Sequence, residues 1–473
     1  MQHPAKRRFA GPAGALAAAA ALALTAAPAQ ADQGLRPLHT VQVSVGVGGA
    51  KPNGQSQSGA VSADGRYALF TSAATDLVAQ PSTSQGGTDA YVRDLDTNRT
   101  ERVSLADDGS ALGGTSSGTA ISADGRFVAF ETDAPGVVPG APAPGRVNVY
   151  VRDRRTGHTD LVSAPHGAPD TDLGHYAWAA SISADGRYVA YVSDRTDLVG
   201  PAKAAGEQLT TPNHDSTVYL TDRWTHTTRV VSATAAGTAA RGESVNATIS
   251  ADGRYVGFSS NAPDLFIPGA PHRTATTPQL SLGQMIQGTY YVYDTTTRAI
   301  VPTSYDTSGQ VTTGATLDAT LSPSGRYVVY GLSVPVGAPD SGQYENQIFA
   351  RDLKKGTLIP LTAGLPGTVS TAGSDSPQVT ADDHWVYFDS FATNLVPGPK
   401  QHDRFDVYRY DLNTGRVERI TDAPDGSPGN GDSDLPHVDA HGRTVLFEST
   451  SRNLVPGQNG PAEPSNIQVF AKH

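Results

Sequence analysis

Two serine motifs in the chain resemble those of hydrolases. Residues 114–118 read G-T-S-S-G and match the G-x-S-x-G nucleophile elbow, and residues 431–435 read G-D-S-D-L and resemble a lipase-type G-D-S block. A nucleophile elbow requires a turn between a strand and a helix. Both serines instead fall at equivalent places in an internal repeat, where the chain enters a predicted β-strand. We therefore predict that neither is a nucleophile, and we assign no catalytic residue.

The histidines and acids are poorly spaced for metal chemistry. The chain has 13 histidines, no cysteine, no H-E-x-x-H string and no D-x-[DN]-x-[DN]-G loop. A histidine-bound divalent metal, as in a propeller-type pectate lyase, would require His175, His214, His402 and His437 to converge, and their spacing does not predict this. Calcium bound by Asp-rich loops is a softer alternative. We predict no metal and no cofactor.

A third set of residues suggests binding rather than catalysis. Aromatic side chains occur beside several carboxylates just before, or at the start of, the first strand of successive repeats. Such a combination holds a sugar ring or a cationic peptide. The alternative is that Trp178 packs between repeats and that the acids are solvated loop residues. The candidate ligand-binding residues are His175, Tyr176, Trp178, Arg241, Glu243, Asn246, Asp318, Asp375, Asp432 and Asp434.

A short string recurs seven times and explains most of the sequence. It reads S-A-D-G-R followed by Tyr or Phe in four copies, S-P-S-G-R-Y in a fifth, and more loosely in two others, at spacings of 58 to 72 residues. A short strand-like run precedes each copy, and further alternating runs follow it, such as F-V-A-F at 127–130 and V-Y-V-R-D at 149–153. The copies begin at Ser62, Ser122, Ser183, Ser250, Ser322, Thr380 and Asp439. Self-similarity at this period indicates a repeat architecture.

Four strands per repeat predict an all-β fold, a seven-bladed β-propeller with four-stranded antiparallel blades. We name the strands of a blade a to d, from the axis outwards. The D-G pair predicts a tight a–b hairpin in which Gly adopts φ > 0 and Asp bonds the turn backbone. We expect the arginines and aspartates of the V-Y-V-R-D strings to form ion pairs and turn caps at the blade edges.

The seventh repeat has only three strands, and the missing strand precedes the first repeat. Residues 40–44 match residues 100–104, the fourth strand of repeat one. We predict that a strand at 40–46 pairs with the C-terminal strands and closes the ring. Residues 32–473 then form one propeller, with repeats at about 57–105, 117–163, 178–232, 246–303, 317–361, 376–421 and 435–471.

The repeat resembles a known family. The string S-x-D-G-R-x-[VA]-x-[FY]-x-S, followed by [VI]-[YF]-x-x-D, is similar to the TolB-type, WD40-like propeller repeat of bacterial envelope and secreted proteins. The resemblance extends from about Leu38 to Phe470. The repeats do not carry the G-H and W-D dipeptides of the eukaryotic pattern. The resemblance implies an N-terminal α/β domain for TolB itself, and we expect no such domain in this sequence. Because this architecture serves scaffolds, lyases, peptidase gates and ligand sensors, it implies the fold and little about activity.

The N-terminus and the overall charge favour an exported protein. Residues 1–31 have a positive start at Lys6, Arg7 and Arg8, an apolar run from about 15 to 27, and A-Q-A ending at Ala31, which is typical of a secretory signal peptide. The apolar run is too short to span a membrane. The formal charge is −11 for the whole chain and −14 without this leader, which disfavours a nucleic-acid partner. We expect a monomer in the medium, cell wall or periplasm, and we assign neither the Sec nor the twin-arginine export route.

The strand order assigns the loops to two faces. The a–b and c–d turns are short and uniform, whereas the b–c loops, at 132–147, 194–216, 260–288 and 390–405, are long and dissimilar. Variable loops on a rigid scaffold commonly bind ligands. We therefore expect a non-enzymatic scaffold that binds an envelope protein, peptide or cell-envelope glycan at the loop-rich mouth of its central channel. A polysaccharide lyase or glycoside hydrolase in the same funnel and a purely structural envelope protein are the alternatives.

Overall fold

The structure is a computed structural model, and the chain divides into residues 1–38 and a second unit, His39–His473. The predicted signal peptide lies outside the described residues. Within the described residues, no helix has the length and apolar character needed to cross a membrane. The structure describes residues 39–80, 86–140, 145–166, 176–195, 197–200, 215–265, 288–312, 314–315, 318–335, 344–365, 368, 370–398, 404–458 and 466–473.

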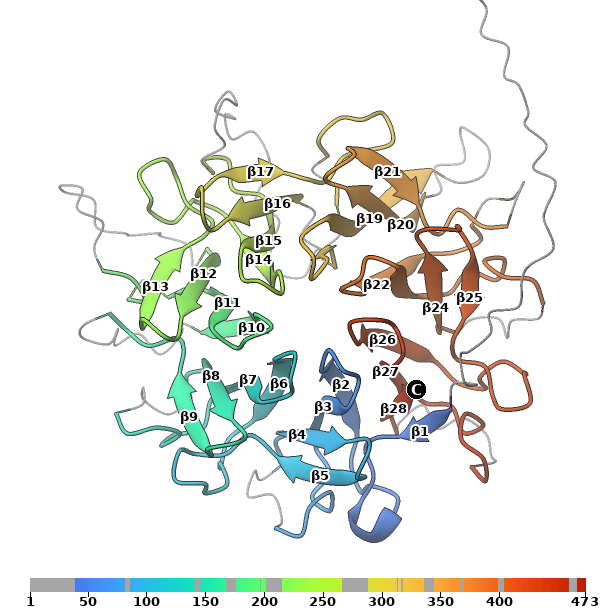
Figure 1. Ribbon diagram of the computed structural model, residues 1–473, viewed down its shortest axis with the longest axis horizontal. Coiled ribbons are helices and arrows are strands. Elements are labelled where there is room, and N and C mark those ends of the chain that lie inside the picture. Colours follow the sequence, from blue (N-terminus) through green and yellow to red (C-terminus); the bar gives the residue numbers. More distant parts are fainter. Residues whose placement is uncertain are drawn as a thin grey trace, which may run out of the picture. The chain divides into compact units, whose positions relative to one another are not determined.

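The second unit is a ring of seven four-stranded antiparallel sheets, as predicted (Figure 1). The innermost strands are β2 (Ser56–Val61), β6 (Ser116–Ile121), β10 (Ala177–Ile182), β14 (Ser244–Ile249), β18 (Thr320–Leu321), β22 (Ser374–Val379) and β26 (Ser433–Val438). The b strands are β3 (Tyr67–Ser72), β7 (Phe127–Thr132), β11 (Tyr188–Ser193), β15 (Tyr255–Ser260), β19 (Tyr327–Pro335), β23 (Trp385–Ser390) and β27 (Val445–Ser449).

The two outer strands complete each blade. The c strands are β4 (Asp89–Asp94), β8 (Asn148–Asp153), β12 (Thr217–Asp222), β16 (Thr289–Asp294), β20 (Tyr344–Asp352), β24 (Asp406–Asp411) and β28 (Gln468–Lys472). The d strands are β5 (Arg99–Arg102), β9 (His158–Leu161), β13 (Thr227–Val230), β17 (Ile300–Pro302), β21 (Thr357–Pro360), β25 (Val417–Arg419) and β1 (Thr40–Gln42). A single 3-10 turn, η1 (Val47–Gly49), follows β1.

The ring closes through the N-terminal strand, which confirms the prediction. Strand β1 pairs antiparallel with β28, so blade 7 has the order β1-β28-β27-β26. The pairing continues beyond the strand, because the Val43 amide donates to the Val469 carbonyl at 2.7 Å. The Ser44 hydroxyl also donates to the Gln468 side chain at 2.7 Å. The edge that blade 7 would otherwise expose is therefore covered.

The repeated S-A-D-G-R string builds the a–b hairpin of each blade. In blade 1, Gly65 adopts φ 77°, and Asp64 Oδ1 accepts hydrogen bonds from the Ser62 hydroxyl and the Arg66 amide. The Arg66 guanidinium then donates two hydrogen bonds to Asp94 at the end of β4. These bonds lower the pKa of Asp94 to about 2. The expectation of ion pairs and caps holds for the aspartates.

The arginine of the equivalent A-Y-V-R-D string at 90–94 forms hydrogen bonds where an ion pair was expected. Arg93 donates to Thr100 Oγ1 and Asn98 Oδ1, so it spans the c–d turn and forms no ion pair with the neighbouring Asp94. The ion-pair partner of Asp94 is instead Arg66 of the D-G-R string, which precedes the neighbouring strand β3. Asp94 Oδ1 also accepts from the backbone amides of Asp96 and Thr97, which caps the c–d turn.

The core of the propeller lies between blades. Seven apolar clusters occupy the described part of the ring, and each combines side chains of two adjacent blades. Leu69 and Val92 of blade 1, for example, pack with Val128 and Phe130 of blade 2. A blade therefore cannot bury its apolar face alone, and the ring stabilises all seven together.

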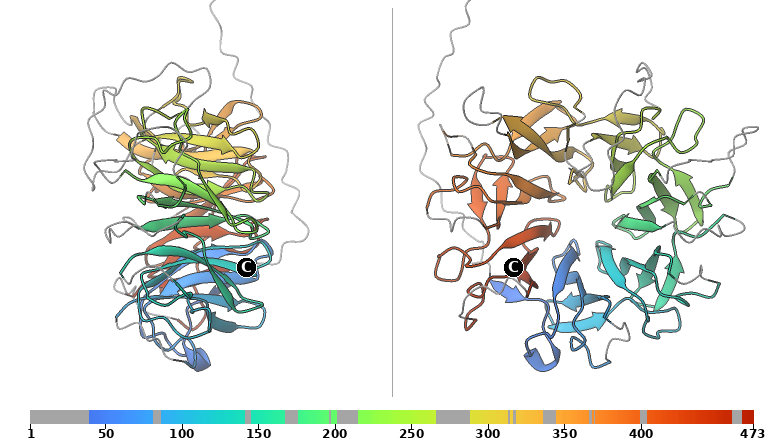
Figure 2. Two further views of the ribbon diagram at one scale, coloured as in Figure 1. Left: turned by 90° about the vertical axis from the view of Figure 1, so that its left-hand side faces the viewer. Right: turned by 180° about the vertical axis from the view of Figure 1, so that it is seen from behind.

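The strand directions define two faces of the ring. Because neighbouring strands are antiparallel, the a–b and c–d turns share one face, which we call the turn face. The b–c loops and the d–a connections share the opposite face, which we call the loop face. The side view in Figure 2 shows the strands running between these two faces. The four long b–c loops predicted from the sequence lie partly outside the described residues.

Candidate ligand-binding face

A β-bulge near the loop face shapes the innermost strand of six blades. The pairing register shifts by one residue within β2, β6, β10, β14, β22 and β26. In four of these strands a non-glycine residue at the bulge has a positive φ, namely Ala179, Asn246, Ser376 and Leu435. Bulges redirect side chains and often occur at functional sites.

An oxygen from the previous blade accepts a hydrogen bond from the bulge backbone in four blades. The Ser58 amide donates to Glu448 Oε1 at 3.0 Å, and the Leu435 amide donates to Asp389 Oδ2 at 3.0 Å. Thr71 Oγ1 accepts from the Gly118 amide of blade 2, and Glu131 Oε1 accepts from the Ala180 amide of blade 3. All four acceptors occupy the same position of strand b. These side chains therefore join the blades at the inner end of the loop face.

Six carboxylates gather near the axis on blades 5, 6 and 7. Asp375 stands opposite Asp389 in the β22–β23 register, and Asp434 stands opposite Glu448 in the β26–β27 register. Directly opposed residues in an antiparallel pair have Cβ atoms about 5 Å apart. No described lysine, arginine or histidine forms an ion pair with any of the six. We call this set the acidic arc; it comprises Asp318, Asp375, Asp389, Asp432, Asp434 and Glu448.

Desolvation and mutual repulsion raise the pKa values within the acidic arc. Burial, with Asp375 and Asp434 nearby, raises the pKa of Asp389 to about 7. Burial and the charge of Asp434 raise the pKa of Glu448 to about 7, and burial with the charge of Asp432 raises the pKa of Asp434 to about 6. Asp318 is solvent-exposed, yet desolvation by its crowded surroundings and the charge of Asp375 also raise its pKa. Asp318, Asp389, Asp434 and Glu448 thus respond to the charges of neighbouring arc members.

A small cavity with a mixed polar and apolar lining adjoins the arc. It has a volume of about 190 Å³ and is lined by Phe405, Asp432, Asp434, Ser449, Thr450 and Ile467. The Phe405 ring lies 3.7 Å, centroid to centroid, from the ring of Phe391, which is 38% exposed. Leu435 at the adjacent bulge is 43% exposed. Carboxylates, aromatic rings and an aliphatic side chain therefore meet at one place on the loop face.

The predicted site residues at the start of blade 3 contribute little to this region. His175 lies outside the described residues. Tyr176 is 40% exposed, and its backbone amide donates to Asp194 Oδ1 at 2.6 Å. Trp178 is partly buried against the apolar cluster between blades 3 and 4. The alternative, that Trp178 packs between repeats, therefore describes its surroundings.

The predicted residues of blade 4 are held by local contacts. Arg241 is 81% exposed in its side chain and pairs with Asp264 at 3.2 Å. Glu243 accepts hydrogen bonds from the amide and hydroxyl of Ser216. Asn246 occupies the bulge and donates its side-chain amide to the Ala319 carbonyl of blade 5. These three residues organise blade 4, whereas Asp318, Asp375, Asp432 and Asp434 belong to the arc.

The sequence missed Asp389, Glu448 and Glu131, the acids of strand b. A signal for them was present, because each is a charged residue at the fifth position of an otherwise apolar alternating run, as in W-V-Y-F-D-S at 385–390. Aligning the seven repeats would have placed these acids in register. Their contact with the next blade depends on the ring and is not visible in one repeat.

The two serine motifs have the structural role expected of them. Ser116 begins β6 and Ser433 begins β26, and both are fully buried. The Ser116 hydroxyl donates to Thr132 Oγ1 at 3.0 Å, and Ser433 Oγ lies 2.8 Å from Ser449 Oγ. Equivalent hydroxyl pairs recur between strands a and b of other blades, so the motifs are a by-product of the repeat.

Metal binding finds no support in the described part of the chain. No group of three or more histidine or acidic side chains there has the arrangement needed to hold a metal ion. Of the four histidines considered from the sequence, His175, His214 and His402 lie outside the described residues. The fourth, His437, is in β26, where burial lowers its pKa to about 4 and keeps it neutral.

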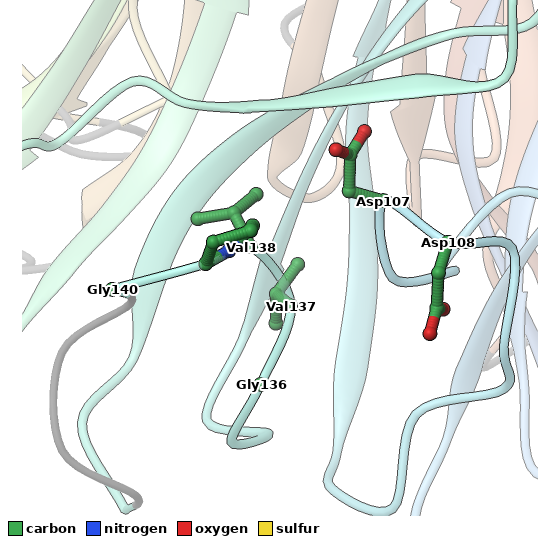
Figure 3. A pocket seen from close by; sticks show the side chains of 7 residues that line it. Asp107, Asp108, Gly136, Val137, Val138 and Gly140 are labelled. Atoms are coloured by element: carbon green, nitrogen blue, oxygen red, sulfur yellow. The ribbon is translucent and has the colours of Figure 1, made fainter.

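A second, larger cavity lies away from the arc. It has a volume of about 480 Å³ and opens between Asp107, Asp108 and residues 136–140 of the blade 2 b–c loop (Figure 3). Asp107 Oδ1 already accepts from His158 Nδ1 at 2.6 Å and from the Thr159 amide at 2.9 Å. Asp108 caps its own hairpin at the Ser110 amide. Both acids are thus engaged in holding local structure.

Comparisons with known proteins support the fold. No family model matches the chain, and no curated protein matches it. Among solved structures, an oligogalacturonate lyase from Vibrio parahaemolyticus has 11% identity and a TM-score of 0.50, over 92% of this chain and 97% of that one. TolB from Acinetobacter baumannii has 14% identity and a TM-score of 0.36, over 89% and 79%. A xyloglucanase from Xanthomonas campestris has 13% identity and a TM-score of 0.45, over 92% and 55%. At 11% identity and a TM-score of 0.50, the likeness to the lyase extends to the propeller fold and no further.

Proposed function

We propose that this chain is a non-enzymatic binding scaffold that holds a protein, peptide or cell-envelope glycan on its loop face, near the axis of the ring. The observation that carries this proposal is the acidic arc. The c-strand aspartates of blades 1 to 5 each have an arginine partner, whereas none of the six arc carboxylates has a cationic partner among the described residues. Unpaired charges at an accessible surface favour an external partner.

Exposed side chains add to the support for the loop face. Tyr344 begins the c strand of blade 5 and is 62% exposed. Its neighbour Asn346 donates to Asp375 Oδ1 at 2.6 Å, so this hairpin lies against the arc. Phe391 and Leu435 are also exposed nearby. Exposed aromatic side chains on rigid strands are typical anchors of a binding surface.

A lyase or glycoside hydrolase at the same place is the second candidate. The opposed pairs Asp375–Asp389 and Asp434–Glu448 favour it, because a retaining glycosidase uses two neighbouring carboxyl groups, and at least one acid of each pair has a raised pKa. However, Asp389 is 2% exposed and Glu448 is 4% exposed, and both accept hydrogen bonds from the next blade. A substrate on the loop face has little access to them. The arc would also repel an acidic polysaccharide.

A capture experiment with matched variants tests the proposal. The chain from residue 32 is immobilised, incubated with envelope extract and displayed to a glycan array. Tyr344→Ala should lower the bound signal several-fold. Trp224→Ala is the control, because Trp224 is also 62% exposed but lies in the c–d turn of blade 3, on the turn face. Equal capture by both variants and the wild type would refute binding through the loop face.

The family and the location belong to the same proposal. We infer an exported protein of the TolB-type, WD40-like repeat family, on the strength of the leader pattern at 1–31 and the seven repeats, four of which carry S-x-D-G-R. Fusing residues 1–40 to a reporter enzyme that is active only after export tests the location. Reporter activity that disappears when Lys6, Arg7 and Arg8 are changed to Glu is the expected result, and an inactive wild-type fusion or activity unaffected by these changes contradicts it.

A further inference from the structure

We propose that the acidic arc binds a flexible organic oligocation, a ligand that carries several ammonium groups along an apolar chain. This inference rests on the proposed binding function and names the class of ligand. It joins three features of the loop face: the charge of the arc, an unsatisfied oxygen of Asp389, and a cavity in which Phe405 and Ile467 lie beside Asp432 and Asp434.

The first feature is uncompensated charge. Asp375, Asp389 and Asp434 lie on adjacent strands of blades 6 and 7, and Asp318 extends the set to blade 5. Crowding like charges costs folding free energy, which a nearby cation would remove. His437, a basic residue in β26, is neutral because its burial lowers its pKa. Proton uptake by Asp389, Glu448 and Asp434, whose pKa values are raised to about 7, 7 and 6, compensates part of this charge, and solvent ions or a ligand compensate the rest.

The second feature is Asp389. Asp389 is 2% exposed and lies between two other acids of the arc. Asp375 is its partner in the β22–β23 register, and Asp434 precedes Leu435, whose amide donates to Asp389. Oδ2 accepts from the Leu435 amide, whereas Oδ1 has no donor in full hydrogen-bonding geometry, although the Ser376 hydroxyl lies close enough to lower the pKa of Asp389. A buried acceptor without a donor is costly. An ammonium group held by Asp375 and Asp434, on either side, would stabilise the charge of this buried carboxylate without entering its site.

The third feature is the kind of surface beside the carboxylates. Phe405 and Ile467 line the same cavity of about 190 Å³ as Asp432 and Asp434. Exposed Phe391 and Leu435 extend this apolar surface. A bare metal ion gains nothing from such walls, and the described acids have no metal-binding arrangement. The methylene stem of an organic ammonium ion packs on them, and an ammonium group is attracted to an aromatic face.

The spread of the arc favours several cationic groups rather than one. Its members come from the inner ends of three consecutive blades, so a single ammonium group cannot contact all of them. A chain with repeated ammonium groups neutralises several carboxylates at once and gains from their effective concentration. Such a ligand is either a polyamine or a lysine-rich peptide, and the two share the same recognition chemistry.

Titration calorimetry at low ionic strength tests this inference, with spermidine and penta-lysine as separate probes. The arc variant carries Asp375→Asn and Asp434→Asn. The control variant carries Asp108→Asn and Asp425→Asn, two exposed hairpin acids, so both variants change the net charge equally. We expect at least one probe to bind the wild type and the control alike, and the arc variant about tenfold more weakly. The probe that binds identifies the source of the cation.

Two outcomes overturn the inference. If both variants lose affinity equally, the probes respond to overall negative charge rather than to the arc. If neither probe binds the wild type, the arc does not recognise oligocations. In that second case, capture that still depends on Tyr344 leaves the proposed binding function standing, whereas capture independent of Tyr344 rejects that function separately.

Proton release provides a second readout. Because burial and repulsion raise the pKa of Asp389 and Glu448 to about 7, a bound cation should lower these pKa values and displace protons at neutral pH. The heat of binding should therefore vary with the ionisation enthalpy of the buffer in the wild type and less in the arc variant. Heat that is the same in every buffer contradicts binding at these carboxylates.

Discussion

Glycine in the D-G turn serves two purposes at the residue scale. Gly125 has φ 70°, and a Cβ atom there would lie 2.2 Å from Cδ2 of Tyr67 in the previous blade. The same contact recurs between Gly186 and Phe127 and between Gly253 and Tyr188. Sequence alone predicts the positive φ, because D-G turns require it. The contact with the neighbouring blade depends on ring geometry, so only the structure reveals it.

Gly125→Ala should destabilise the propeller far more than Gly109→Ala. Gly109 has φ 83° with nothing within 4 Å of the added Cβ, so its variant incurs backbone strain alone, about 1 kcal/mol. Gly125→Ala adds a steric conflict with Tyr67, and we expect a further loss of about 2 kcal/mol. Urea denaturation of the two variants measures the difference. Equal midpoints would contradict the inter-blade contact.

Leu435 provides a second test at this scale. A leucine with φ 49° is strained, and its side chain is 43% exposed, so it gains little from burial. Asn tolerates this conformation and already occupies the equivalent bulge of blade 4 as Asn246. Leu435→Asn should therefore raise the free energy of unfolding by about 1 kcal/mol, measured by urea denaturation. A lower stability would mean that the leucine packs more than its exposure indicates.

Strand β1 determines closure at the element scale. The sequence predicted this strand because residues 40–44 repeat the pattern of 100–104, and its pairing with β28 confirms that prediction. The positions of the acids in strands a and b could be predicted only in part. Asp375 and Asp434 were found from their place before the first turn, but their opposed partners were hidden in apolar runs.

A proline scan of β1 tests closure. The Val43 and His39 amides donate to β28, so by alternation the Val41 amide points to Ala471 and the Gln42 amide points away. Val41→Pro should remove a ladder hydrogen bond and lower the thermal midpoint by several degrees, whereas Gln42→Pro should have a smaller effect. Deleting residues 32–50 should lower it by many degrees. An unchanged midpoint after the deletion would rule out closure by this strand.

The number of blades and the fold were predictable at the scale of the whole molecule, because seven copies of one string encode seven equal units. The candidate site was predictable only in part. Asp318, Asp375, Asp432 and Asp434 were expected from the sequence, but Asp389, Glu448 and the distinction of blades 5 to 7 from the rest were not. That distinction arises from where equivalent positions carry Asp or Glu rather than Ser, Thr or Val. Its consequence, a set of unpaired and partly protonated acids, depends on how adjacent blades meet.

The raised pKa values predict a stability that falls with rising pH. Folding raises the pKa of Glu131, Asp389 and Glu448 to about 7 and that of Asp434 to about 6. Between about pH 4 and 7 the folded chain therefore binds more protons than the unfolded chain. Stability is therefore fully present below the unfolded pKa values and is lost as pH rises through the folded ones. His437, with its pKa lowered to about 4, opposes this with a single proton.

The urea midpoint should accordingly be higher at pH 5 than at pH 7.5. Glu131→Gln is the informative variant, because the amide oxygen still accepts the Ala180 amide while one titrating group is removed. It should flatten the pH dependence by about 1.4 kcal/mol per pH unit where that group titrates. A midpoint that rises from pH 5 to 7.5 would show that the acids ionise freely in the folded ring.

Photo-crosslinking from two matched positions tests binding through the loop face most directly. A photoreactive phenylalanine replaces either Tyr344 on the loop face or Trp224 on the turn face, both 62% exposed. The protein is irradiated in envelope extract, and adducts are identified by mass spectrometry. We predict a specific adduct from position 344 and none from position 224. The adduct from position 344 should be lost when Asp375→Asn and Asp434→Asn are present, or when excess spermidine or penta-lysine competes. Adducts from 224 alone, or equal adducts from both positions, would contradict this prediction.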